Sequence, residues 1–140
     1  MKVSDPPVQQ ATPKEKFDVL YATLIQLHEG LIQFELHNGT FLFLIFGWLL
    51  TAADAQLLLQ ASRPIRLALI VTLFGLTGFH AWWVYRHYVR SVAVHQLLLA
   101  LNYVPASYLE SRRIHKGLAL SFVGGHALLS LIICFSAWLI

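Results

Sequence analysis

Apolar residues follow a seven-residue repeat through the first part of the chain. The positions that repeat at steps of three and four are Phe17, Leu20, Leu24, Leu27, Leu31 and Phe34. This spacing is typical of a helix that packs one face against other helices. Thr12, Pro13 and Glu15 form a capping pattern at its start. The pattern therefore predicts a helix over residues 13–38, preceded by a flexible arm of residues 1–12.

Three later segments have the length and apolar character of membrane spans, which need roughly 20 mostly apolar residues. They cover residues 40–59, 65–85 and 118–140. The fold class we predict is all-α: an integral membrane helical bundle with three transmembrane helices. We assign residues 13–140 to one helical membrane domain.

The predicted helices continue beyond the membrane on one side. The helical pattern of the second span persists until Asn102, where the chain offers a helix end. Ser107 and Glu110 then form a second capping pattern, at the start of the helix that becomes the third span. Residues 13–38 and the connection 86–117 are therefore expected to form a short cytoplasmic helical bundle.

Composition agrees with a membrane protein. Of 140 residues, 57% are hydrophobic and 12% are charged, whereas a soluble domain carries about twice that charge. The high apolar content also argues against a disordered chain. A single cysteine, Cys134, excludes an intramolecular disulfide framework and a zinc site of several thiolates.

The basic residues are distributed unequally between the two sides of the predicted membrane. Eight of the ten fall on the side of the N-terminal arm: Lys2, Lys14, Lys16, Arg86, Arg90, Arg112, Arg113 and Lys116. Only Arg63 and Arg66 lie between the first and second spans. The positive-inside rule then predicts a cytoplasmic N-terminus and a C-terminus on the outer, periplasmic side of the cell (inner) membrane. The net charge of +3 reflects this topology, so nucleic acid is not an expected partner.

Small residues follow one face of the third span. Gly117, Ser121 and Gly125 are four residues apart, and such a row lets another helix approach closely. The partner is either the second span of the same chain or a helix of another subunit.

Two acidic residues lie in or beside the first span. Asp54 is near its outer end, where Arg63 and Arg66 are the expected ion-pair partners; a proton or ion site is the alternative. Glu35 lies just on the inner side of the first span and faces the same choice, with His37, Arg86 or His87 as its expected partner.

Two of the seven histidines, His80 and His126, fall inside predicted spans at similar depth. Two imidazoles placed in this way can ligate a haem iron axially. The alternative is a hydrogen bond across helices, to Ser130 or Thr77. The stretch Phe79-His80-Ala81-Trp82 looks like the haem-ligating stretch in the three-span membrane anchors of succinate dehydrogenase. That likeness covers four residues and the family's quinone-site pattern does not follow, so we do not assign the chain to it.

The sequence carries none of the common catalytic motifs, such as a phosphate-binding glycine loop, HExxH or GxSxG. We therefore expect no enzymatic activity. The expected function is that of an accessory or assembly subunit of a membrane complex, or of a homo-oligomeric scaffold or pore. Its partners would be the lipid bilayer and further copies or other membrane subunits. The alternative is a membrane anchor for electron transfer that binds haem b through His80 and His126; otherwise no cofactor is expected.

Overall fold

The computed structural model describes residues 11–140, and every regular element in that range is a helix. The helices are α1 (Pro13–Thr51), α2 (Ala53–Ala61), α3 (Arg63–Leu101), α4 (Ala106–Glu110) and α5 (Lys116–Leu139). The predicted all-α class is confirmed. Of the predicted arm, residues 1–10 lie outside the described residues.

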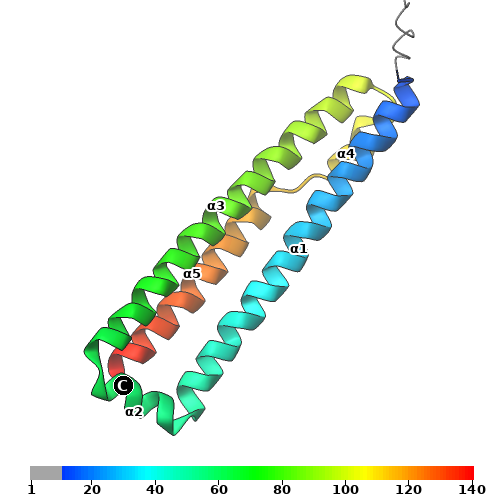
Figure 1. Cartoon of the computed structure of the whole chain (residues 1–140). Helices are drawn as coiled ribbons and strands as arrows, with labels where there is room; N and C mark the ends of the chain where they lie inside the picture. The colour runs from blue at the N-terminus through cyan, green and yellow to red at the C-terminus, as the bar shows by residue number, and fades with distance from the viewer. Residues whose placement is uncertain (1–10) are drawn as a thin grey trace, which may run out of the picture.

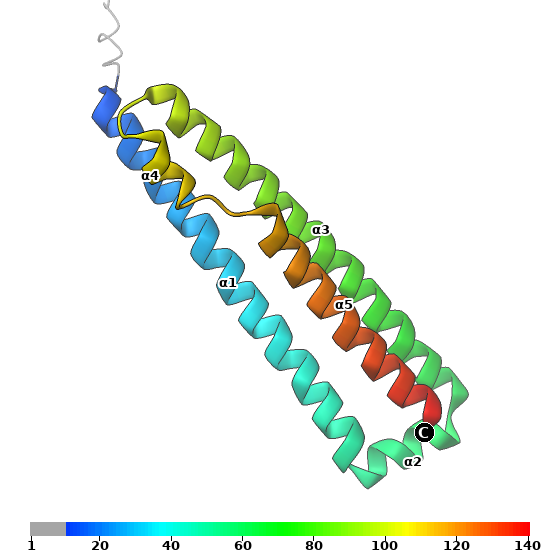
Figure 2. The same cartoon turned by 180° about the vertical axis from the view of Figure 1, so that it is seen from behind.

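Two long helices form the frame of an elongated bundle. α1 and α3 run antiparallel along its whole length (Figure 1). α5 lies beside one half of this pair, and α4 with the loop after it lies beside the other half (Figure 2). α2 crosses the end of the bundle at which the C-terminus lies. The start of α1 and the C-terminus are therefore at opposite ends.

The start of α1 is the capping box that the sequence predicts. The backbone N–H of Thr12 donates to the Glu15 carboxylate at 2.7 Å, and that of Glu15 donates to the Thr12 hydroxyl at 3.3 Å. The Asn38-Gly39 pair allows a kink, yet α1 passes through it unbroken. The Asn38 amide instead donates to the Phe34 carbonyl one turn earlier, at 2.9 Å.

The predicted heptad face points into the bundle. Phe17, Leu24 and Leu31 are buried, and the intervening Leu20, Leu27 and Phe34 are half-buried. The buried face continues as Leu42 and Leu49. The step from Leu31 to Leu42 is eleven residues, which is the seven-residue repeat with an insertion of four. One helix face therefore carries core residues along the whole of α1.

α1 ends at Thr51, and the chain turns by 83° into α2 through the extended residue Ala52. The predicted span over residues 40–59 is therefore not one straight helix. Arg66, at the start of α3, donates to the Leu59 carbonyl at 2.9 Å and reaches the Trp138 carbonyl at 3.5 Å. This one side chain connects the end of α2 to the end of α5.

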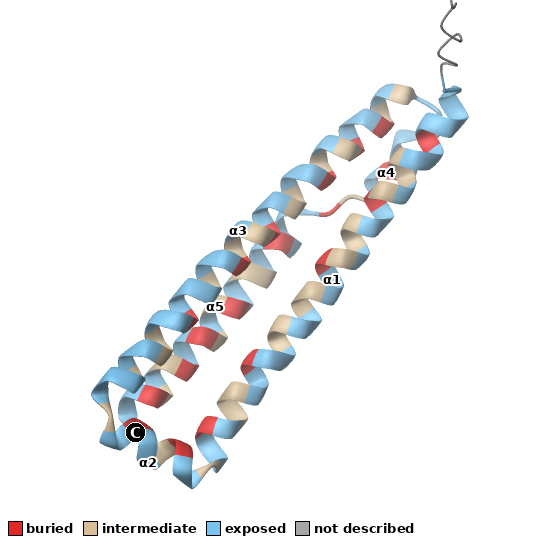
Figure 3. Cartoon of the chain, in the orientation of Figure 1, coloured by how far each residue is buried: buried red, intermediate tan, exposed pale blue. Residues whose placement is uncertain are grey.

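The core is a column of apolar clusters along the axis of the bundle, and Figure 3 shows the buried positions facing inward on each long helix. From the α4 end to the α2 end, the buried members are Phe17, Leu24, Leu98 and Leu109; then Leu31, Val84, Ile114 and Ala119; then Leu42, Leu73 and Ile133; and finally Leu49, Leu59 and Ala137. A column of this kind fixes the register of the helices at every level.

The connection between α3 and α5 differs in part from the prediction. α3 ends where predicted, with Asn102 in the left-handed conformation (φ 47°) that asparagine tolerates. The prediction of one helix running from Ser107 into the third span is wrong. α4 ends at Glu110, and the chain turns so that Ile114 is buried before α5 begins at Lys116. A separate short helix thus replaces the expected extension of the third span.

Among residues 11–140, two helices are by themselves long and apolar enough to cross a membrane: α3 and α5. The bent pair α1 and α2 also qualifies when it is taken as one broken span. The chain therefore has two or three candidate membrane-spanning helices by length and composition, as expected of a membrane protein.

Candidate functional site

Three polar side chains from three helices meet inside the bundle, about halfway along it. Oε1 of Glu35, on α1, lies 2.6 Å from Nε2 of His80, on α3. The His80 ring stacks on the ring of His126, on α5, with 4.0 Å between centroids and 10° between planes. The side chain of His80 is 1% exposed and that of Glu35 is 15% exposed, and His126 is buried. We call these three residues the central cluster.

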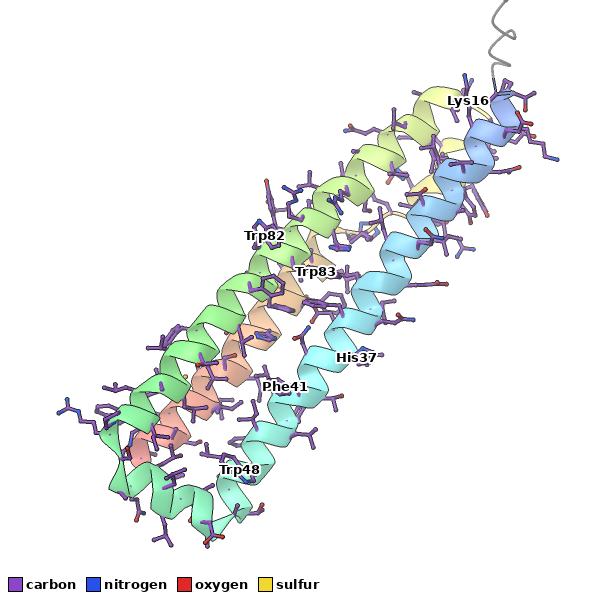
Figure 4. All side chains as sticks on the ribbon, viewed as in Figure 1. Lys16, His37, Phe41, Trp48, Trp82 and Trp83 are labelled. Carbon is purple, nitrogen blue, oxygen red and sulfur yellow. The ribbon has the colours of Figure 1, made fainter. Side chains whose placement is uncertain are left out.

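Aromatic rings extend this stack toward the α4 end. Phe34 stacks on His80 at 5.6 Å and on Trp83 at 3.7 Å, and Trp83 stacks on His87 at 3.5 Å. Trp83 points toward α1, whereas the neighbouring Trp82 points away from it (Figure 4). The central cluster is therefore enclosed on one side by ring faces rather than by water.

The protonation chemistry of the central cluster follows from this setting. A carboxyl group and an imidazole in hydrogen-bond contact share one proton, and the pair is neutral overall wherever that proton lies. Nδ1 of His80 and Nε2 of His126 are buried without a hydrogen-bond partner among the described residues. A second proton would place net positive charge in an apolar interior, which is costly. The cluster is thus suited to hold one shared proton and to join three helices at one level.

The expected partners of the two acidic residues are wrong. Glu35 pairs with His80 rather than with His37, Arg86 or His87, because Glu35 and His80 face each other across the α1–α3 interface. Asp54 is exposed in the first turn of α2, and it has no ion-pair partner among residues 11–140. Its expected partner Arg66 binds backbone carbonyls instead, because the turn at Ala52 rotates α2 away from the line of α1.

The two predicted haem ligands are neighbours, but their arrangement is not that of axial ligands. Axial ligation places the iron and its flat macrocycle between the two histidines. Here the imidazole faces are in direct contact, and Nε2 of His80 already contacts Glu35. This arrangement does not fit a haem between the rings. Within residues 11–140, no three histidine, cysteine or acidic residues converge closely enough to hold a metal ion.

Polar contacts beside the central cluster also cross helices. Oγ1 of Thr77, on α3, lies 2.8 Å from the Leu73 carbonyl and 2.9 Å from Oγ of Ser130, on α5. Thr77 has one hydroxyl proton, so when it donates to Leu73, Ser130 donates to Thr77. Thr77 and Ser130 therefore bind each other, and neither binds His126 as the sequence suggested.

The small-residue row of α5 faces outward. Gly117, Ser121 and Gly125 are all exposed. Apart from the adjacent backbone of its own helix, a Cβ built at either glycine would meet no described atom within 4 Å. Packing of this row against the second span of the same chain is therefore wrong, and packing between subunits stays a prediction.

A second histidine–carboxylate pair lies near the α4 end and was missed by sequence reasoning. His95, on α3, is buried, and its Nε2 lies 3.3 Å from Oε1 of Glu110, on α4. Arg113 lies 3.6 Å from the same carboxylate. The hydrogen bond from His95 holds the pKa of Glu110 below its ordinary value, and Arg113 adds to this. The sequence feature that could have identified His95 as buried is its spacing from Ser91 and Leu98, which continues the inward face of the helix.

Comparison of the whole chain with protein-family models, with curated proteins and with solved structures found no match.

Proposed function

We propose that this protein is a non-enzymatic, three-span membrane protein that works as an assembling unit. In this role it is an accessory subunit of a larger membrane complex, or a homo-oligomeric scaffold or pore. The observation that carries the proposal is an apolar surface at the α4 end of the bundle, in a region that a bilayer would not cover.

The proposed position of the bilayer follows from α5. Its 24 residues extend about 36 Å at 1.5 Å per residue, which is close to the thickness of a hydrocarbon core. Leu31 of α1 packs at the same level as Ala119, and Leu49 packs at the level of Ala137. The first span would therefore be the part of α1 between Leu31 and Thr51, with α2 lying at the outer surface. This places the central cluster within the inner half of the membrane.

The proposed orientation rests on the charge distribution. Arg112, Arg113 and Lys116 lie at or just before the start of α5, on the same side of the proposed membrane as Lys14 and Lys16. Arg63 and Arg66 lie at the other end, with the C-terminus. By the positive-inside rule the α4 end is cytoplasmic and the C-terminus is periplasmic, in the cell (inner) membrane.

The cytoplasmic part exposes apolar side chains where the surroundings would be water. A groove of about 540 Å³ runs between α1 and α3, lined by Val19, Leu20, Leu97 and Leu101 among others. Val19 is 66% exposed and Leu97 is 55% exposed. Tyr88 lies level with the start of α5, beside Lys116, and Leu97 is roughly 14 Å farther from the proposed membrane at 1.5 Å per residue. Contiguous apolar surface of this kind marks an interaction site.

The test is crosslinking of the purified full-length protein in mild detergent. We expect multimers from the wild type. Leu97→Glu should reduce them several-fold, because it places a charge in the groove. Gln96→Glu adds the same charge at the neighbouring exposed position and is the matched control, which should crosslink like the wild type. A wild type that stays monomeric and partnerless, or a Leu97→Glu variant that assembles normally, would contradict the proposal.

The alternative of a haem b electron-transfer subunit has weaker support, because the stacked rings of His80 and His126 leave no space between them. It has a direct test in the absorption spectrum of the purified protein. A Soret band that disappears in His126→Ala would favour haem over the assembling unit. A spectrum without that band, from protein free of iron, would end the alternative.

A further inference from the structure

A small hollow lies between α3 and α5 on the outer surface of the bundle. It has a volume of about 120 Å³, and its apolar wall includes Ala81 and Tyr85 from α3 and Ala119 and Val123 from α5. Both alanines line the hollow, and larger side chains at these positions would take up part of its volume. In the proposed bilayer this surface would face lipid, just below the cytoplasmic boundary.

The cytoplasmic rim of this hollow carries positive charge. Lys116 lines it together with Tyr88, and Lys116 has no ion-pair partner among residues 11–140. An apolar hollow with a cationic rim at the inner membrane surface is complementary to an anionic phospholipid.

We propose that this hollow binds one acyl chain of an anionic phospholipid, with the lipid phosphate held by Lys116. The tyrosines suit the boundary, because their rings are apolar and their hydroxyls are polar. The start of α5 adds donors, since its first backbone N–H groups point out of the helix and no side chain within residues 11–140 caps them. A narrow hollow between two helices admits a flexible chain more readily than a third helix. The inference rests on the proposed membrane placement but not on assembly.

The experiment is native mass spectrometry of the full-length protein released from detergent. The probes are phosphatidylglycerol and phosphatidylcholine with identical acyl chains. Phosphatidylglycerol should be retained in preference to phosphatidylcholine. Lys116→Gln should lower phosphatidylglycerol binding roughly fivefold, since one basic residue near an anionic headgroup contributes that much. Ala81→Leu should lower the binding of both lipids, because it fills the hollow.

Two further variants control for charge. Lys116→Arg should retain the preference, and Lys16→Gln, the same charge loss at the exposed start of α1, should not alter it. Equal retention of the two lipids would overturn the proposal, as would equal effects of Lys116→Gln and Lys16→Gln. It would also be overturned if Ala81→Leu abolished a dimer while no lipid preference existed, since a second copy would then fill the hollow.

The two proposals fail separately. A wild type that crosslinks but shows no lipid preference contradicts the lipid site alone. A wild type that gives no crosslinked multimers, while Lys116→Gln still lowers phosphatidylglycerol binding, contradicts assembly alone. Release of the protein from membranes at high pH, as a peripheral protein, would contradict the membrane placement and with it the lipid site.

Discussion

The two halves of the bundle each contain a histidine–carboxylate pair, but the pairs are set differently. Beside α5, Glu35 and His80 are 2.6 Å apart, and the Glu35 side chain is 15% exposed. Beside α4, His95 and Glu110 are 3.3 Å apart, and the Glu110 side chain is 49% exposed. Water can replace the partner of an exposed carboxylate but not that of an enclosed one. The same two residue types therefore make an internal cross-link in one half and a surface contact in the other.

The largest effect should come from breaking the enclosed pair. Glu35→Leu leaves Nε2 of His80 without its partner in an apolar interior. We expect a loss of about 2 kcal/mol in the free energy of unfolding, the cost of leaving a buried polar group without its hydrogen-bond partner. Thermal unfolding in detergent, followed by circular dichroism, would measure it.

The double variant Glu35→Leu with His80→Leu is the control for that prediction. It removes both polar groups, so it should be more stable than either single variant. If the double variant were the least stable of the three, the pair would not be the cross-link we describe.

A glycine substitution can show whether subunits assemble through the outer face of α5 or through the groove at the α4 end. Gly125 lies on the exposed face of α5, where an added Cβ meets no described atom within 4 Å apart from the adjacent backbone of its own helix. Gly125→Leu should leave the stability of the monomer within about 0.5 kcal/mol, as for most surface changes. If the row packs between subunits, the crosslinked fraction should fall several-fold.

The matched control is Gly75→Leu, the same change at an exposed and open position of α3. It should leave crosslinking at the wild-type level. Unchanged crosslinking in Gly125→Leu would restrict assembly to the cytoplasmic groove. Equal losses in both variants would show a general effect of bulk rather than packing of the row.

The sequence predicted the fold well where local patterns decide it. The heptad residues face inward, the capping box at Thr12 forms, and α3 ends at Asn102. The turn at Ala52 and the break between α4 and α5 were not predicted. In both places the local residues are compatible with a continuing helix, and packing between distant segments determines the outcome. Burial of Ile114 against Leu31 and Val84 is one such contact.

The candidate site was predicted only in part, for a similar reason. The sequence predicted that His80 and His126 are neighbours because they lie at similar depth in two predicted spans, and the structure places their rings in contact. Depth says nothing of the direction of a ring, so face-to-face stacking was not foreseen. Glu35 was given the wrong partners, because the rotation of α1 about its axis depends on the whole buried face rather than on nearby residues.

A smaller effect is expected from the hydroxyl pair beside the central cluster. Thr77→Val and Ser130→Ala each remove one side of the contact between α3 and α5. A double-mutant cycle should give a coupling of about 0.6 kcal/mol, the average for such bonds between membrane helices. Additive single effects would show that the two hydroxyls bind their own helix backbones rather than each other.

The smallest effect should belong to the exposed pair, and it should depend on pH. Because the folded state holds the pKa of Glu110 below its ordinary value, the pair contributes stability above the unfolded pKa of about 4.3. That contribution disappears as the pH falls through the lower pKa of the folded protein. The melting temperature of the wild type should therefore slightly exceed that of Glu110→Gln at pH 7, and the difference should vanish toward pH 3. Equal melting temperatures at pH 7 would mean that the contact between α4 and α3 depends on shape rather than on charge, because glutamine has nearly the shape of glutamate, and the exposed pair would then contribute nothing through its charge.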